Sequence, residues 1–192
     1  MRYATLSAKA ALALVLPRNQ RRICDSLDLI PVPVRGLDAH NAATYLRTLP
    51  NIQADRIGIV GFSHGGGATL SAAVDERIPV DRGGRPFQAA VAYYPWCSPG
   101  TIVLPYATDL LILIGKDDSW TPADRCIKSV AERANQAHPP AIKVYPGALH
   151  DFDSGGLPTL SSSGHMIGGN PEAAADSFAM TKAFLDARLK SK

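Results

Sequence analysis

The chain has 192 residues, of which 46% are hydrophobic and 19% are charged, an ordinary balance for one globular domain with a sizeable core. The formal net charge of +3 is small, and the dispersed basic residues argue against a nucleic-acid-binding groove. The three cysteines, Cys24, Cys97 and Cys126, show no C-x-x-C spacing, so neither a zinc site nor a dense disulfide framework is expected. We expect no metal, no cofactor and no nucleic-acid partner.

The opening 16 residues allow more than one interpretation. Arg2 and Lys9 precede an apolar run over 10–16, which weakly resembles a signal peptide but is short and lacks a small-x-small cleavage site. A membrane span needs roughly 20 apolar residues, so no membrane partner is expected. We expect a cytoplasmic location for the sequence as given, with a secreted or periplasmic one as the alternative. Residues 11–16 fit a buried strand, although their composition suits a helix equally.

The next segments predict alternating helices and strands. Residues 18–34 contain Pro31 and Pro33 and are predicted to form a loop. Apolar residues at helical spacing predict an amphipathic helix over 39–49, and a strand and a helix over 65–74 follow it. The remaining expected elements are an exposed loop over 75–88, strands over 89–94, 109–115 and 142–145, a helix capped by Thr121 that runs to about Ala137, a loop over 153–169, and a helix over 171–189.

This alternation predicts an α/β fold with a mostly parallel sheet covered by helices on both faces, in a single domain over residues 1–192. The run DLLILIG at 109–115 has apolar residues at consecutive positions, as expected of a strand buried on both sides. In such sheets ligands bind beyond the carboxyl ends of the strands. The residues that follow each strand are therefore the candidates for function.

The stretch RIGIVGFSHGGGATL over 56–70 predicts a strand, a sharp turn and a helix around a G-x-S-x-G pattern. That context is typical of a nucleophile elbow, in which the serine stands at the tip of a strained turn. Gly61 and Gly65 flank Ser63, and we expect both to avoid collisions that a Cβ would cause. The His64 amide, at a helix N-terminus, is a candidate oxyanion donor. No lysine follows the glycines, which disfavours a phosphate loop.

Polar residues follow two further strands. Asp117 and Asp118 follow the strand over 109–115, and His150 follows the strand over 142–145. The order of serine, acid and histidine is that of the α/β-hydrolase triad, in which the histidine takes the serine proton. Each residue also has a plainer interpretation, as a solvated acid or a surface histidine. His40, His138 and His165 are expected to have ordinary structural roles.

Four aromatic residues flank these candidates. They could line a substrate pocket, but aromatic residues near strand ends also commonly belong to the core. They are Phe62, Trp96, Trp120 and Phe152.

Cys97 and Cys126 follow strands near the same edge, and the sequence leaves open whether they form a disulfide or remain buried thiols.

The chain resembles the dienelactone hydrolase family of α/β-hydrolases, through RIGIVGFSHGG, AAVAYYPWC, LLILIGKDDSWTPADRC and VYPGALHDF. The resemblance extends from about Pro17 to the C-terminus. It implies that Ser63 is the nucleophile and His150 the base. It also implies that Asp118 is the acid, because the family's carboxylate lies four residues before a proline, here Pro122. Asp117 is the runner-up.

Two departures from the family shape the expected function. The type enzyme uses a cysteine nucleophile, so Ser63 favours a hydrolase of small carboxylic esters or lactones that works through an acyl-enzyme. Family members also carry N-terminal strands and a turn that supplies a second oxyanion amide, and we find no counterpart in this sequence, so we expect a truncated α/β-hydrolase with reduced activity. Residues 11–16 are expected to pair beside the elbow strand. The alternatives are a serine peptidase or thioesterase, or an inactive remnant.

Overall fold

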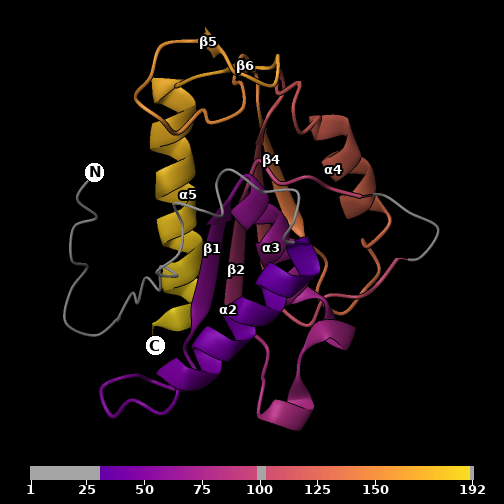
Figure 1. The fold of residues 1–192 in the computed structure, drawn as a ribbon, viewed down its shortest axis with the longest axis vertical. Helices are drawn as coiled ribbons and strands as arrows, with labels where there is room; N and C mark the ends of the chain where they lie inside the picture. The colour runs from indigo at the N-terminus through magenta and orange to yellow at the C-terminus, as the bar shows by residue number, and fades with distance from the viewer. Residues whose placement is uncertain (1–30, 99–102, 191–192) are drawn as a thin grey trace.

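A parallel sheet forms the centre of the molecule (Figure 1). The computed structural model describes residues 31–98 and 103–190. In these residues the main sheet has four strands in the order β1-β2-β3-β4, all parallel. The strands are β1 (Gly58–Phe62), β2 (Ala89–Tyr93), β3 (Leu110–Gly115) and β4 (Ala141–Tyr145). Because they are parallel and sequential, the loops that follow them all leave from one edge of the sheet.

Helices cover both faces of this sheet. They are α2 (Val32–Leu46), α3 (His64–Ala73), α4 (Ala123–Ala131) and α5 (Pro171–Leu189). A Cβ at Gly61 would collide with α3, whereas a Cβ at Gly58 would meet Leu185 and Leu189 of α5. Residues three apart on a strand face opposite sides, so α3 and α5 lie on opposite faces. The helix α2 packs on α3 and forms an outer layer.

The helix α2 begins earlier than the sequence pattern predicts. We expected a loop through residue 34, but Pro31 is the N-cap and Pro33 lies in the first turn of the helix. Proline is tolerated there because the first N–H groups of a helix have no helical acceptor. The helix also ends at Leu46 rather than near Leu49. The two prolines therefore mark a helix start, and the prediction of a loop was wrong for residues 32–34, whereas residues 18–30 lie outside the described residues.

The other expected elements are present, with changes in detail. The helix α4 ends at Ala131 rather than near Ala137, and its N-cap is Pro122 rather than Thr121. The predicted loop over 153–169 contains a hairpin formed by β5 (Thr159–Leu160) and β6 (Met166–Ile167). The loop over 75–88 contains two short 3-10 turns. The strand predicted over 11–16 lies outside the described residues, among which β1 pairs only with β2.

The core lies between the sheet and its helices. Every residue of β2 and β3 is buried, as the unbroken apolar runs predict for strands covered on both faces. A cavity of about 260 Å³ lined by Phe87, Thr108 and His138 lies at the opposite end of β2 and β3 from the loops that carry the candidate site residues. None of the described helices is long and apolar enough to cross a membrane.

Candidate active site

Ser63 lies in a strained turn between β1 and α3. Its φ of 51° and ψ of −116° place it in a region that L-residues seldom adopt, as a nucleophile elbow requires. The turn is tight enough that a Cβ at Gly61 would collide with the Gly65 carbonyl, and one at Gly66 would lie 2.6 Å from the Tyr93 carbonyl oxygen. A Cβ at Gly65 would meet nothing within 4 Å. The glycines needed for close approach are thus Gly61 and Gly66, and our expectation for Gly65 was wrong.

The structure brings Ser63, His150 and Asp118 into one hydrogen-bonded chain. His150 Nε2 lies 2.9 Å from Ser63 Oγ, and His150 Nδ1 lies 2.8 Å from Asp118 Oδ2. Both His150 and Asp118 are only 3% exposed. Asp117, by contrast, is exposed. With Nδ1–H donating to the carboxylate, Nε2 is free to accept the Ser63 proton.

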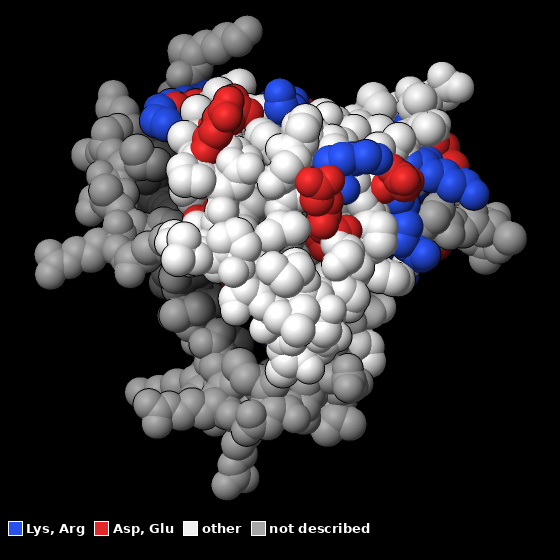
Figure 2. All heavy atoms as spheres, turned by 90° about the horizontal axis from the view of Figure 1, so that it is seen from above, with Lys and Arg blue, Asp and Glu red and all other residues white. Residues whose placement is uncertain are grey.

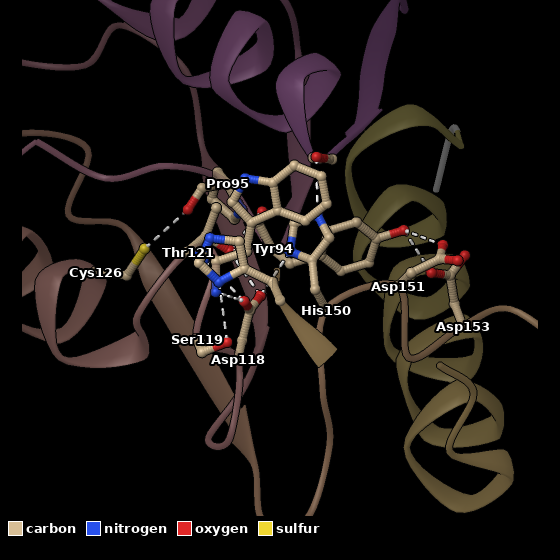
Figure 3. Close-up of polar contacts among 12 residues, drawn as sticks. Tyr94, Pro95, Asp118, Ser119, Thr121, Cys126, His150, Asp151 and Asp153 are labelled. Atoms are coloured by element: carbon tan, nitrogen blue, oxygen red, sulfur yellow. Dashed lines mark hydrogen bonds and ion pairs between the residues drawn. The ribbon is translucent and has the colours of Figure 1, made fainter. Parts of the chain in front are cut away.

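A turn centred on Asp118 holds the carboxylate in place (Figure 3). Its Oδ1 accepts hydrogen bonds from the backbone N–H groups of Trp120 and Thr121, each at 2.8 Å, and its Oδ2 accepts one from Thr121 Oγ1 at 2.6 Å. Burial alone would raise the pKa of Asp118, but the hydrogen bonds from His150 and Thr121 outweigh it and hold the pKa below its usual value. Asp118 is therefore a carboxylate at neutral pH.

Thr121 is a site residue that sequence reasoning missed. We expected it to cap α4, but its hydroxyl instead bonds to Asp118 and lies 3.1 Å from the Tyr94 carbonyl oxygen. An Asp followed by a hydroxyl residue three positions later is typical of a turn in which the carboxylate accepts local N–H groups. That pattern could have identified Thr121.

The loop after β4 places His150 close to Asp118 because its backbone lies against the backbone at the end of β3. A Cβ at Gly115 would collide with the Ala148 carbonyl, and the Asp117 N–H donates to that carbonyl at 3.0 Å. This contact joins the end of β3 to the segment before His150. It accounts for the short distance between the acid and the histidine.

Tyr94 packs against His150 and was also missed. Its ring centroid lies 4.6 Å from that of His150, edge to face. Its hydroxyl donates to Asp153 Oδ1 at 2.6 Å and lies 3.4 Å from Asp151 Oδ1 (Figure 3). Burial raises the pKa of Asp153, and burial likewise raises that of Tyr94. Tyr94 thus links the end of β2 to the loop that carries His150.

His64 is the first residue of α3. Backbone N–H groups in the first turn of a helix lack helical acceptors, so the His64 amide is available beside Ser63. Its imidazole Nδ1 is buried without a hydrogen-bond partner in the described part of the chain. Burial, followed by the positive charge of Arg35, lowers the pKa of this ring.

The four aromatic candidates occupy different environments. Trp120 is 38% exposed and its ring centroid lies 5.0 Å from that of His150. Trp96 is half exposed beneath the Arg125 guanidinium. Phe62 is partly buried and stacks on Tyr93. Phe152 is fully buried in the core, so it does not form an exposed pocket wall.

The other histidines separate into two groups. His40 is buried, and its Nε2 bonds to the Ala72 carbonyl oxygen at 2.9 Å, while His138 pairs with Asp109 at the far end of the sheet. His165, from the β5–β6 hairpin, instead stacks on Trp120 and lies 3.1 Å from Ser119 Oγ. His165 is therefore a neighbour of the site, and no local pattern in the sequence marks it as one.

Cys97 and Cys126 form a disulfide. The bond joins the segment after β2 to α4. The sequence had left open whether these two cysteines are paired.

Among the described residues, no group of histidine, cysteine and acidic side chains is arranged to hold a metal ion. Seen from above, the molecule shows a broad area without charged side chains (Figure 2).

Comparison with known protein families gives a match over most of the chain. The model of the dienelactone hydrolase family matches residues 16–189. The chain belongs to the dienelactone hydrolase family. The match begins within one residue of the boundary that the motifs predict.

Solved structures share the fold at low sequence identity. A protein from Klebsiella pneumoniae, provisionally named a dienelactone hydrolase, has a TM-score of 0.63 and 20% identity, over 88% of this chain and 68% of that one. A dienelactone hydrolase-like promiscuous phosphotriesterase from metagenomic libraries has a TM-score of 0.63 and 17% identity, over 88% and 66%. An esterase from Thermogutta terrifontis has a TM-score of 0.63 and 16% identity, over 85% and 69%. The fold is thus that of the α/β-hydrolases.

A curated relative carries a different name. A Mycobacterium tuberculosis protein, provisionally named a phosphoribosyl transferase, is 31% identical over 147 residues. The match covers 74% of this chain but 29% of that protein. The chain thus spans less than a third of the length of the curated relatives that it matches.

Proposed function

We propose that the chain is a serine hydrolase of small carboxylic esters or lactones. The observation that carries the proposal is the chain of hydrogen bonds from Ser63 Oγ to His150 Nε2 at 2.9 Å and from His150 Nδ1 to Asp118 Oδ2 at 2.8 Å. A serine hydroxyl is a weak nucleophile until an adjacent base accepts its proton. In this proposal His150 is that base and Asp118 is the carboxylate that orients it.

The reaction follows from these positions. Ser63 Oγ attacks the ester carbonyl carbon while its proton passes to His150 Nε2, and Asp118 stabilises the resulting imidazolium. The carbonyl oxygen becomes an oxyanion that the His64 amide can bind. The C–O bond to the alcohol then breaks, and the alcohol leaves with the proton from His150. Water, deprotonated by the same nitrogen, hydrolyses the acyl-enzyme and regenerates Ser63.

Small uncharged esters and lactones suit the surroundings of the site. Trp120 is 38% exposed and its ring centroid lies 5.0 Å from that of His150, so an aromatic surface is accessible beside the proposed base. Sites for small uncharged molecules are lined mainly by apolar and aromatic side chains. Membership of the dienelactone hydrolase family supports the same substrate class.

The decisive experiment compares wild type with Ser63→Ala. Wild type should hydrolyse p-nitrophenyl acetate and become labelled by a fluorophosphonate, and the variant should do neither although it folds equally well. Loss of the nucleophile lowers kcat by about 10⁶ in the serine protease subtilisin, and we expect a comparable loss here. Folded wild-type protein that is neither active nor labelled would contradict the proposal. A panel of lactones, thioesters and peptides then defines the preferred substrate.

A further inference from the structure

The indole of Trp120 contacts two imidazole rings. Its ring centroid lies 5.0 Å from that of His150, with the planes tilted by 37°. It lies 5.4 Å from that of His165, with the planes only 14° apart. Trp120 is 38% exposed, so burial of apolar surface does not by itself explain a tryptophan at this position.

Backbone contacts fix both Trp120 and the hairpin that lies beside His150. The backbone N–H of Trp120 donates to Asp118 Oδ1 at 2.8 Å. The turn that holds the carboxylate therefore also fixes the backbone position from which the indole extends. On the other side, His150 and Ile167 form a β-bridge, and the Gly168 N–H donates to the His150 carbonyl at 3.0 Å. The β5–β6 hairpin is therefore fastened beside His150.

His165 reaches the same turn from the hairpin. Its Nδ1 lies 3.1 Å from Ser119 Oγ, and its ring is stacked on Trp120. Met166, the next residue along the chain, and its pairing partner Leu160 are exposed, and successive residues of an extended chain point to opposite sides. The hairpin thus directs His165 toward Trp120 and Ser119.

The position of Trp120 matters when His150 becomes charged. The face of an aromatic ring attracts a cation, and tryptophan provides the strongest attraction. In the proposed reaction His150 carries a full positive charge only after it takes the Ser63 proton. An interaction that strengthens at that point raises kcat without tightening substrate binding.

We propose that Trp120 is a positioning residue that stabilises the His150 imidazolium through its indole, and that His165 holds Trp120 in place by stacking. The inference rests on the proposed serine hydrolase function, since the charge on His150 arises in that reaction. Trp120 acts through His150 and needs no contact with the substrate. The β5–β6 hairpin is then part of the catalytic apparatus.

The first test compares Trp120→Leu with Trp120→Phe. The leucine variant keeps an apolar side chain but loses the ring, so its kcat should fall by about 3- to 30-fold while KM changes by less than about twofold. The phenylalanine variant keeps a ring face and should recover most of the loss. A leucine variant as fast as wild type, or a phenylalanine variant as slow as the leucine variant, overturns the proposal.

The second test concerns His165. His165→Ala should lower kcat by a smaller factor, and His165→Phe, which can stack, should restore it. Because His165 acts through Trp120, the double variant with Trp120→Leu and His165→Ala should be no slower than Trp120→Leu alone. Additive losses overturn the role of His165. His138→Ala, a histidine at the far end of the sheet, is the matched control and should leave kcat unchanged.

A measurement without substrate separates this inference from the proposed function. A proton that lies over an aromatic ring face is shielded by that ring, so the His150 ring-proton NMR resonances should move downfield in Trp120→Leu and in part return in Trp120→Phe. If the shift is present and wild type hydrolyses nothing, the contact stands and the proposed function fails. If the resonances do not differ between wild type and Trp120→Leu, the inference fails whatever the activity.

Discussion

At the scale of single residues, the site depends on close approach at particular glycines. The backbone turn at Ser63 brings Gly66 against the Tyr93 carbonyl, while the side-chain direction at Gly65 is open. The sequence pattern treats the glycines of GFSHGGG as equivalent. Only the position of β2, which is a tertiary contact, distinguishes them.

This difference predicts opposite effects of two alanine substitutions. Gly66→Ala should destabilise the fold by about 1–3 kcal/mol, because its Cβ would lie 2.6 Å from a backbone oxygen that cannot easily move. Gly65→Ala should stabilise it by roughly 0.5–1 kcal/mol, because alanine is the better helix former. Urea unfolding of the two purified variants measures both effects. Equal destabilisation by the two substitutions would contradict the structure.

The adjacent residues Asp117 and Asp118 allow a second comparison between a pair of matched substitutions. Asp118→Asn should lower kcat by about 10⁴-fold, as the same replacement of the triad acid does in a serine protease, because an amide cannot hold His150 in the right tautomer and balance its charge. Asp117→Asn should retain activity, since Asp117 is exposed and Asp118 is the residue bonded to His150. The measurement is p-nitrophenyl acetate hydrolysis at saturating substrate. A larger loss in Asp117→Asn than in Asp118→Asn would reverse the assignment.

At the scale of elements, the sequence predicts well where long apolar runs or strong end signals occur. The strands β2 and β3 and the helix α5, with its Asn170 N-cap, agree with the pattern. The start of α2 was misjudged because Pro31 and Pro33 favour a loop as readily as a first helical turn. The β5–β6 hairpin was missed because its strands have two residues each, too short for any periodicity to show.

The residues of the proposed triad and their neighbours also differ in how far the sequence predicts them. Ser63, Asp118 and His150 each follow a strand, so the rule for parallel sheets selects them from the sequence. Trp120 was selected as a neighbour of the acid. Tyr94 and His165 reach His150 only through the packing of separate elements, which spacing along the chain does not encode.

The disulfide between Cys97 and Cys126 should contribute to the stability of the fold. Cys97 and Cys126 are 29 residues apart, and closing a loop of that size stabilises a fold by about 3–4 kcal/mol in the chain-entropy model. Reduction with dithiothreitol should therefore lower the urea midpoint of wild type. The double variant Cys97→Ser, Cys126→Ser should start from the lower midpoint and show no further response. An unchanged wild-type midpoint on reduction would contradict this prediction.

At the scale of the whole molecule, one carboxylate connects three separate parts of the chain. Asp109, just before β3, lies 3.0 Å from His138 Nδ1, before β4, and accepts a hydrogen bond from Arg188 Nε of α5 at 2.8 Å. These contacts lie at the end of the sheet opposite Ser63. They hold α5 against the sheet away from the site, so their loss should affect stability more than catalysis.

Because the pKa of Asp109 is shifted, the stability that its contacts with His138 and Arg188 provide should depend on pH. The hydrogen bond with His138 lowers the pKa most, burial opposes it, and Arg188 lowers it further, so the net pKa lies below the usual value. A folded pKa below the unfolded one stabilises the fold above the unfolded pKa, and this contribution is lost as the pH falls through the folded pKa. Asp109→Asn should thus lower the urea midpoint clearly at pH 7, with a difference from wild type that shrinks as the pH falls below about 4. Asp55→Asn, at an exposed carboxylate, is the control and should change the midpoint little. A constant difference between Asp109→Asn and wild type from pH 7 to pH 3 would show that the carboxylate charge contributes nothing to the connection.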